Sequence, residues 1–430
     1  MRNTTLYTSE CLFIEGGQRL KGSVRISGSK NASLPVMMSS LLTDQVCEIH
    51  EVPHLLDVES TIELLQVLGV DVSYDGGCVR IDPSKVNSFV APDNIVRRMR
   101  ASVLAMGPLL ARFGRAVVAM PGGCSIGVRA IDQHIKVFEK GGTFVRVEHG
   151  YIHLEVERIK PVEYTFEVVT VTGTENALMF LSRCEKRSIL RNIAVEPEVI
   201  DLVEVLKSMG VSIEIEGRTA IIKGNAELKG FDHKVIPDRI EAGTFLVAGF
   251  MTGGDIELEN VRVEHLGSVI EKIREAGACV EILAPDKLRV RSEGDGIRPI
   301  SISTSEYPGF PTDMQAQFMS MCCIARGSSE ITENIFENRF QHVAELQRMG
   351  ADIHVKGRTA FIRGVKKLTG AEVFSTDLRA SASLVLAGLV AEGRTIVREI
   401  YHLDRGYEKL DEKLKGLGAL IQRRPTFDIT

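Results

Sequence analysis

VESTIELLQVLGVDVSYDGGCVRID, residues 58–82, contains a helical pattern, a glycine and two strand-like segments in a single run. Apolar residues recur at helical spacing from Val58 to Leu68, and the pattern ends at Gly69. Strand-like segments flank Asp75-Gly76-Gly77, a turn signal that joins antiparallel neighbours. A helix is expected upstream near residues 31–42 and a strand near 47–52. The stretch therefore predicts an α/β unit.

The same order of helix, glycine and strand recurs along the chain. Six glycines mark it, and the first three map onto the last three by a uniform shift of 208 residues. Further hairpins are expected around residues 216–218 and 356–358, each followed by Thr-Ala. The sequence therefore predicts two halves of three units, joined by a short hinge near residues 235–238, with a ligand cleft between two similar lobes. The six glycines are Gly69, Gly142, Gly210, Gly277, Gly350 and Gly418.

Length and composition exclude several classes of protein. The chain has 430 residues, of which 44% are hydrophobic and 25% charged, typical of a globular protein of two or three domains. A net charge of −5 argues against general nucleic-acid binding. No apolar run reaches membrane-spanning length, and the first 17 residues lack the apolar core of a secretory signal. We expect a cytoplasmic protein.

One cysteine differs from the others in its surroundings. Cys124 lies in Pro121-Gly122-Gly123-Cys124-Ser125-Ile126-Gly127, with the cation of Arg129 close behind, where positive charge and exposure favour a thiolate. The residues alone leave a reactive thiol and an inert turn cysteine as equal alternatives. The remaining cysteines are expected to be structural, and none has metal-ligand spacing. These are Cys11, Cys47, Cys78, Cys184, Cys279, Cys322 and Cys323.

Charged residues stand where several helices are expected to begin. Helix N-termini attract anions, so Lys30 after Gly28-Ser29 suits a phosphate or carboxylate. For Asp313 and Asp377, helix capping is the stronger expectation from local pattern. Four arginines are also candidate site residues, although an arginine side chain is usually exposed to solvent. Walker and dinucleotide-binding motifs are absent, so ATP and nicotinamide chemistry have no support. The arginines are Arg100, Arg339, Arg379 and Arg405.

Seven ordered motifs give the chain a family resemblance over nearly its whole length. The chain resembles the UDP-N-acetylglucosamine 1-carboxyvinyltransferases, a family of enolpyruvyl transferases. The motifs are Gly28–Ala32, Met99–Ser102, Pro121–Gly127, Phe310–Gln317, Phe336–Phe340, Asp377–Ser381 and Asp404–Tyr407.

The resemblance implies a fold and a reaction. The fold is a two-domain inside-out α/β barrel, with three βαβαββ units in each domain. One domain covers residues 30–237, and the other covers 1–29 plus 238–430, because the N-terminal strand returns to complete it. The reaction transfers the enolpyruvyl group of phosphoenolpyruvate to the 3-hydroxyl of UDP-N-acetylglucosamine and releases phosphate. No cofactor, metal, nucleic acid or membrane is implied.

The resemblance also implies residue roles. Cys124 protonates the methylene carbon and can form an adduct with phosphoenolpyruvate, while Asp313 binds the 3-hydroxyl and removes its proton. Lys30, Arg129 and Arg405 hold phosphoenolpyruvate, and Lys30 and Arg405 join the catalytic set. The catalytic residues come from both halves, so both lobes are needed. The remaining substrate contacts implied are Asn31, Arg100, Ala130, Ile131, Asp132, Gln133, Ile335, Arg339 and Arg379.

The chain departs from the family at one place and leaves two alternatives open. A lysine and a Ser-Val-Gly of the family are replaced by Val168 and Thr170-Val171-Thr172, so uridine and diphosphate contacts there are not fixed by the resemblance. One alternative is the related shikimate-pathway enolpyruvyl transferase, which lacks the cysteine loop. The other is a catalytically silent paralogue that binds sugar nucleotide and regulates a partner.

Overall fold

The computed structural model describes residues 10–120 and 131–426, which divide into two compact units. We call residues 27–120 with 131–236 the N-half unit, and residues 10–26 with 237–426 the C-half unit. Each unit has its own cluster of buried apolar side chains. No helix in the described ranges is long and apolar enough to cross a membrane.

Each unit contains three sheets of four strands built to one plan. The first strand of each sheet is parallel to the second, and the second, third and fourth are antiparallel. In order across each sheet, the N-half strands are β14 (Asp232–Lys234), β3 (Cys47–His50), β5 (Cys78–Asp82) and β4 (Asp71–Asp75); β6 (Val90–Ala91), β7 (Arg115–Ala119), β9 (Tyr151–Glu155) and β8 (Phe144–Glu148); and β10 (Glu163–Thr165), β11 (Ser188–Arg191), β13 (Thr219–Lys223) and β12 (Ser212–Glu216).

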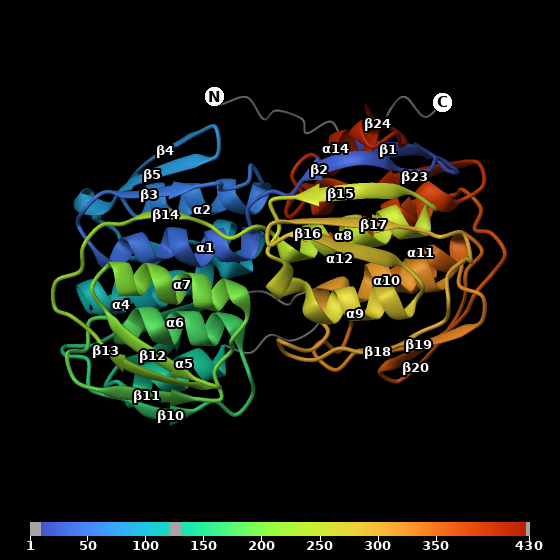
Figure 1. The fold of residues 1–430 in the computed structure, drawn as a ribbon. Coiled ribbons are helices and arrows are strands. Elements are labelled where there is room, and N and C mark those ends of the chain that lie inside the picture. Colours follow the sequence, from blue (N-terminus) through green and yellow to red (C-terminus); the bar gives the residue numbers. More distant parts are fainter. Residues whose placement is uncertain (1–9, 121–130, 427–430) are drawn as a thin grey trace. The chain divides into compact units, whose positions relative to one another are not determined.

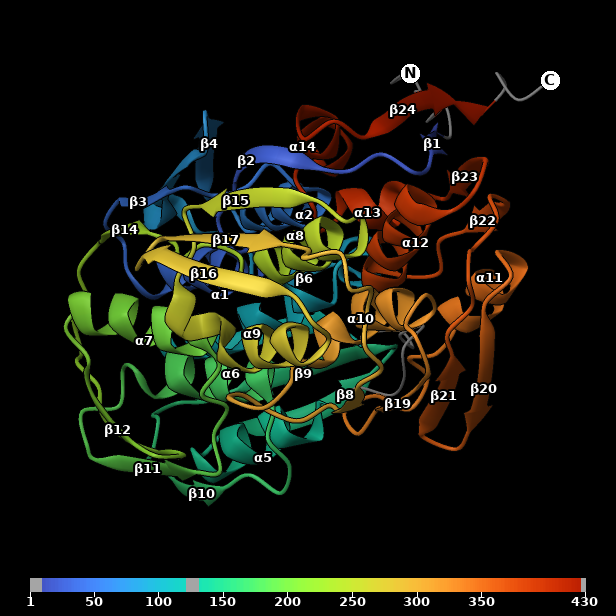
Figure 2. The ribbon, with the colours of Figure 1, turned by 45° about the vertical axis from the view of Figure 1, so that its right-hand side comes forward.

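The C-half unit repeats this plan, and one of its sheets joins distant parts of the sequence. β1 pairs with both β23 and β24, so a strand near one end of the sequence lies between two near the other end (Figures 1 and 2). The C-half strands are β2 (Lys21–Arg25), β15 (Asp255–Glu259), β17 (Lys287–Arg291) and β16 (Cys279–Ala284); β18 (Ser301–Ser303), β19 (Ser328–Thr332), β21 (Thr359–Arg363) and β20 (Asp352–Lys356); and β22 (Glu372–Phe374), β23 (Arg394–Arg398), β1 (Glu10–Glu15) and β24 (Leu420–Pro425).

Helices fill the space between the sheets of each unit. The N-half helices are α1 (Lys30–Ser39), α2 (Leu56–Val67), α3 (Asp93–Arg98), α4 (Met106–Phe113), α5 (Asp132–Lys140), α6 (Val171–Leu181) and α7 (Pro197–Ser208), with 3₁₀ turns η1 (Ser40–Leu42), η2 (Pro83–Lys85) and η3 (Arg100–Ala105). The C-half helices are α8 (Arg239–Met251), α9 (Gly267–Glu275), α10 (Gln315–Cys322), α11 (His342–Arg348), α12 (Leu378–Val390), α13 (Tyr401–Asp404) and α14 (Leu410–Gly416), with η4 (Val263–Leu266) and η5 (Thr312–Met314).

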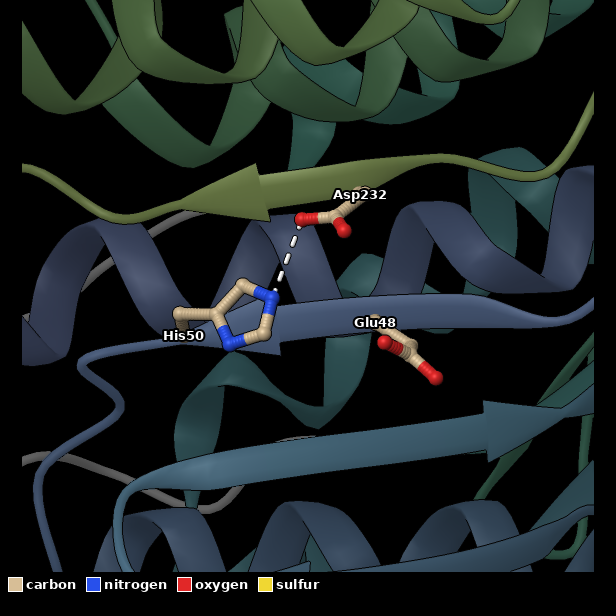
Figure 3. A group of neighbouring side chains, drawn as sticks. All are labelled: Glu48, His50 and Asp232. Carbon is tan, nitrogen blue, oxygen red and sulfur yellow. Dashed lines mark hydrogen bonds and ion pairs between the residues drawn. The ribbon is translucent and has the colours of Figure 1, made fainter.

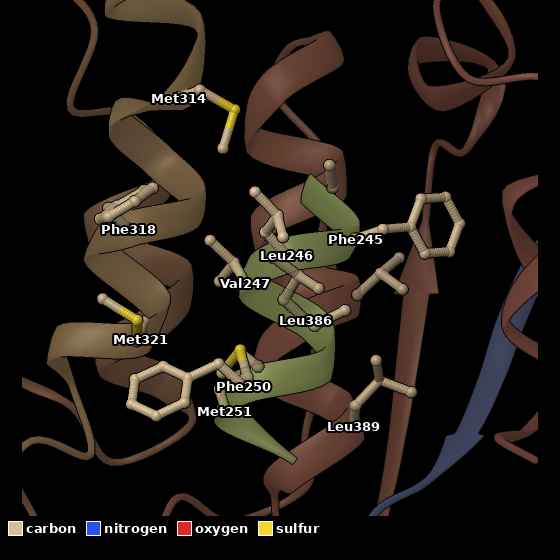
Figure 4. Packing of buried hydrophobic residues seen from close by; sticks show 14 of the residues in the cluster. Phe245, Leu246, Val247, Phe250, Met251, Met314, Phe318, Met321, Leu386 and Leu389 are labelled. Carbon is tan, nitrogen blue, oxygen red and sulfur yellow. The ribbon is translucent and has the colours of Figure 1, made fainter. Parts of the chain in front are cut away.

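The most buried helices occupy the interior of each unit. In the N-half unit, α1, α6 and α7 lie between the sheet of β3, β5 and β14 and the sheet of β10–β13 (Figure 1). In the C-half unit, α8, α10 and α12 pack side chains such as Phe245, Phe318 and Leu386 into the core (Figure 4). Fully burying one such side chain contributes about 1.5–3 kcal/mol. The predicted α/β class with inward helices is confirmed.

The predicted repeat is visible in the backbone. All six marker glycines have a positive φ, between 90° at Gly350 and 110° at Gly210 and Gly277, and each follows a helix and precedes a strand. The expected hairpins form as antiparallel pairs closed by Asp75↔Cys78, Glu216↔Thr219 and Lys356↔Thr359. The helix expected at residues 31–42 consists of α1 followed by η1. The second helix of the same unit, expected from Val58 to Leu68, is α2.

We expect Gly418→Ala to lower the free energy of unfolding by about 1–2 kcal/mol, because φ is +99° there and an L side chain is strained in that region. A Cβ at Gly418 would meet only a backbone oxygen at 4.0 Å, so the cost comes from the backbone rather than from a clash. Gly416→Ala is the matched control. Gly416 ends α14 in open space, and alanine should be neutral or stabilising there. Urea unfolding of both variants measures the difference, and equal stabilities would contradict the backbone argument.

Candidate active site

Asp313 is held by two buried arginines of the C-half unit. Arg339 Nη2 donates to Asp313 Oδ1 at 2.8 Å, and Arg379 Nη2 donates to Oδ2 at 3.0 Å. The arginines are 4% and 3% exposed, whereas the side chain of Asp313 is 26% exposed. Each carboxylate oxygen therefore has its own guanidinium, and the carboxylate keeps access to solvent.

Local sequence explains how these three residues meet. Asp313 lies in η5, and Arg379 lies in the first turn of α12. Asp377 caps α12 by accepting hydrogen bonds from the N–H groups of Arg379 and Ala380, as expected. The expectation that Asp313 caps a helix is wrong: the N-cap positions of η5 and α10 are Pro311 and Met314, and neither makes a side-chain capping bond. Asp313 is turned toward the arginines instead.

The solvent exposure expected for Arg339 and Arg379 is also wrong. Burial acts to lower the pKa of Arg379, but the negative charge of Asp313 raises it above its usual value, and the neighbouring Tyr407 hydroxyl contributes further. Arg379 therefore stays charged although it is buried. Its Nη1 is buried and has no hydrogen-bond partner within the described ranges. A buried guanidinium with an unused donor is well suited to an anionic ligand.

A neutral hydrogen-bonded group supports the backbone at Asp313. Gln317 lies one helical turn later, with its Nε2 2.9 Å from the Asp313 carbonyl oxygen, 3.2 Å from Thr244 Oγ1 and 3.1 Å from Tyr407 Oη, and these three acceptors share its two hydrogens. Burial raises the pKa of Tyr407, so its hydroxyl remains protonated. The Arg379 guanidinium lies 5.3 Å from the Tyr407 ring centroid, within cation–π range.

The buried ring of His342 interacts electrostatically with one of these arginines, Arg339. Burial lowers the pKa of His342 to about 4. The positive charge of Arg339 also lowers this pKa, whereas the negative charge of Asp377 opposes the shift. The ring is therefore neutral near pH 7 and adds no positive charge next to Arg339. Arg405 follows α13 as its C-cap residue and is half-buried. The adjacent Asp404 is bound by Arg423 at 2.7 Å.

In the N-half unit, Lys30 begins α1, as the sequence predicts. Ser29 caps the helix by accepting from Ala32 N–H at 3.2 Å, and Lys30 Nζ lies 3.0 Å from Asp57 Oδ2 on α2. Asp57 is buried, so this pair fixes the direction of the lysine. Asn31 follows, half-buried, in the first turn of α1.

The segments predicted to bind the sugar nucleotide are partly described. Cys124, Arg129 and Ala130 lie outside the described residues, and Arg100 begins η3. Ile131 is the N-cap residue of α5, followed by Asp132 and Gln133 in the first turn. The Gln133 side chain is buried and accepts from Tyr164 Oη at 3.1 Å and Glu167 N at 3.0 Å. The contacts of these residues with a nucleotide stay predictions.

At the place where the chain departs from the family, the first turn of α6 is fixed by its own cap. Thr170 Oγ1 accepts from Gly173 N–H at 3.1 Å. Val168, which replaces the lysine of the family, is 62% exposed. A buried core role for Val168 is therefore excluded.

One group of described side chains has spacing suited to a metal ion. Glu48, His50 and Asp232 lie on β3 and β14, with their ligand atoms within 4.8 Å of one another (Figure 3). His50 Nε2 is already 3.0 Å from Asp232 Oδ1, and Glu48 lies 3.8 Å from Arg80. Asp232 is exposed and the other two residues are partly exposed, so we interpret them as surface ion pairs and assign no metal to them.

Sequence reasoning missed Glu333. Its carboxylate is 1% exposed and accepts hydrogen bonds from the Thr312 and Thr304 hydroxyls, both at 2.9 Å, and from the N–H groups of Ile335 and Phe336. The signal available was a single acidic residue directly after the strand-like alternation of residues 328–332. Glu333 therefore binds the backbone of the predicted site residue Ile335 directly, and it is linked to Arg339 through Thr312, whose hydroxyl accepts from Arg339 Nη1 at 3.2 Å.

Comparison with known proteins identifies the family of enzymes to which the chain belongs. The family described as EPSP synthase (3-phosphoshikimate 1-carboxyvinyltransferase) matches residues 14–414. The chain belongs to this family of carboxyvinyltransferases.

Individual proteins and solved structures are also similar to this chain. A protein of Geobacter metallireducens named UDP-N-acetylglucosamine 1-carboxyvinyltransferase is 51% identical over 414 residues, covering 96% of this chain and 99% of the relative. A protein of the same name from Geotalea uraniireducens is 50% identical with the same coverage. Among solved structures, the enolpyruvyl transferase NikO from Streptomyces tendae has a TM-score of 0.88 at 25% identity, covering 96% of this chain and 99% of that one. An EPSP synthase from Acinetobacter baumannii has a TM-score of 0.75 at 18% identity, covering 97% of this chain and 100% of that one, a likeness of fold.

Proposed function

We propose that this protein transfers the enolpyruvyl group of phosphoenolpyruvate to the 3-hydroxyl of UDP-N-acetylglucosamine, an early step of peptidoglycan synthesis. The observation that carries the proposal is the pair of relatives about half identical to this chain over 96% of its length, both named for this transfer. The cluster of Asp313, Arg339 and Arg379 supports it, because it offers both a carboxylate for a hydroxyl and an unused buried donor for an anion.

The proposed chemistry is an addition followed by an elimination. The Cys124 thiol gives a proton to the methylene carbon of phosphoenolpyruvate, while the 3-hydroxyl oxygen bonds to the neighbouring carbon and passes its proton to Asp313. The resulting tetrahedral intermediate then loses a proton from its new methyl group and expels inorganic phosphate, which restores the double bond. General acid and base groups are required at both stages.

We assign the remaining roles by charge. Lys30, Arg129 and Arg405 would hold phosphoenolpyruvate, whose phosphate and carboxylate suit cationic partners. Residues 131–133, with Asn31, Arg100 and Ile335, would bind the sugar nucleotide. The functional domains would be residues 30–237, and 1–29 with 238–430. None of the seven described cysteines is in a disulfide, which suits a reducing compartment, so we place the reaction in the cytoplasm.

Phosphate release with two alternative acceptors tests this function. We expect release from phosphoenolpyruvate with UDP-N-acetylglucosamine, and only background release with shikimate 3-phosphate. The reverse result would assign the chain to the shikimate reaction. Binding of UDP-N-acetylglucosamine with no phosphate release from either pair would indicate a catalytically silent binding protein.

A further inference from the structure

Glu333 connects two segments of the site through one buried carboxylate. Oε1 accepts from Thr304 Oγ1 and Ile335 N, each at 2.9 Å, and from Phe336 N at 3.2 Å. Oε2 accepts from Thr312 Oγ1 at 2.9 Å. All four donors are neutral, and such bonds are what a buried carboxylate needs in place of water. Glu333 thereby ties the segment of Thr312 and Asp313 to the segment of Ile335 and Arg339.

The Thr312 hydroxyl links Glu333 to Arg339 by hydrogen bonds. A hydroxyl has one hydrogen, and Thr312 gives it to Glu333, so a lone pair remains to face Arg339. Arg339 Nη1 donates to that oxygen at 3.2 Å, and Nη2 of the same guanidinium donates to Asp313 Oδ1 at 2.8 Å. The planar guanidinium is thus fixed at two corners, and one of them fixes the Asp313 carboxylate.

We propose that Glu333 is a positioning residue for the transfer reaction: through Thr312 and Arg339 it sets the orientation of the Asp313 carboxylate, and through the Ile335 N–H it holds the backbone assigned to the sugar nucleotide. This inference rests on the proposed function. The Glu333 carboxylate is 1% exposed and both of its oxygens already accept hydrogen bonds, so its effect reaches the reaction through the direction in which Asp313 faces the 3-hydroxyl. Misplacing a reacting group by about 1 Å can cost about 100-fold in rate.

Glu333→Gln is the direct test, because it preserves size and one acceptor but replaces the other acceptor with an NH₂ donor. If that donor faces Thr312, the threonine hydrogen is redirected toward Arg339, where two donors then oppose each other. We expect kcat for phosphate release to fall about 10- to 100-fold. The KM for phosphoenolpyruvate should change little, because the residues assigned to that substrate lie elsewhere in the sequence.

A double-mutant cycle separates positioning from general structural damage. Thr312→Val removes the same link, so the double variant should be no slower than the slower single variant. Thr332→Val is the matched control: its hydroxyl lies one residue before Glu333 but bonds Thr359 at 3.0 Å, and its kcat should equal that of the wild type. Effects that multiply in the double variant would overturn the proposal, as would equal losses in Thr312→Val and Thr332→Val.

Thermal unfolding of each variant shows how much of the protein is folded under the assay conditions. If the smaller folded fraction fully accounts for the loss of kcat, the proposal is also overturned. Should Glu333→Gln fail to fold, Thr312→Val decides the matter, since wild-type kcat in that variant would exclude the link. A wild-type protein that releases no phosphate would remove the proposed function together with this inference. An active wild type with unimpaired Glu333→Gln and Thr312→Val would remove this inference alone.

Discussion

Cys124→Ser is expected to bind UDP-N-acetylglucosamine as the wild type does and to lose phosphate release by about 10²- to 10⁴-fold, the usual contribution of a general acid. The reason is acidity: a thiol loses its proton near neutral pH far more readily than a serine hydroxyl, and the methylene carbon needs a proton before the acceptor can add. Steady-state phosphate release measures the loss. Calorimetric titration with the sugar nucleotide confirms that binding survives.

Alkylation by the epoxide fosfomycin provides an independent readout of the same residue. We expect wild type to gain one adduct and Cys124→Ser to gain none. Cys78→Ser is the control, because Cys78 is a half-exposed free thiol on β5 and should affect neither turnover nor alkylation. Burial raises the pKa of Cys47 and of Cys322 to about 12, so neither competes as a thiolate. Wild-type turnover or undiminished alkylation in Cys124→Ser would reject the assignment.

The repeat could be predicted because it is recorded in local chemistry. A helix that stops at a glycine and continues as a strand needs a positive φ at that glycine, and all six markers have one. The turn at Asp75-Gly76-Gly77 likewise set the pairing of β4 with β5. Each of these signals depends on residues close together in the sequence.

The placement of β1 could not be obtained in this way. The sheet of β22–β24 takes its third strand from residues 10–15, at the far end of the sequence. No local pattern states which distant strand fills a sheet position, since any strand of suitable alternation could pair there. Only the family resemblance predicts that an N-terminal strand returns to this half.

Asp313 shows the same limit within the site. Its position after Phe310-Pro311-Thr312 resembles a helix start, so the local pattern predicts that Asp313 caps a helix. Its true partners, Arg339 and Arg379, follow 26 and 66 residues later, and their burial depends on tertiary packing. Glu333 was missed for a similar reason, because two of its four donors, the Thr304 and Thr312 hydroxyls, come from 29 and 21 residues earlier in the sequence.

Asp313→Asn is expected to reduce kcat for phosphate release by about 10²- to 10⁴-fold. The amide cannot take up the proton of the 3-hydroxyl, and it must present an NH₂ group to one of the two guanidinium groups that the carboxylate oxygens now bind. Two buried arginines then share less negative charge, so the unfolding temperature should also fall. Phosphate release, sugar-nucleotide titration and thermal unfolding of the same preparation keep the catalytic and structural losses apart.

Asp352→Asn is the matched control, since it removes an aspartate–arginine pair from the same unit but at the surface. Asp352 lies 3.8 Å from Arg363, and both side chains are more than half exposed. Such a pair contributes about 0–1 kcal/mol, so neither kcat nor the unfolding temperature should change appreciably. If folded Asp313→Asn retains kcat within about tenfold of wild type, the loss is too small for a general base. In that case Asp313 would serve to bind the acceptor, and its proton would have to leave through another group.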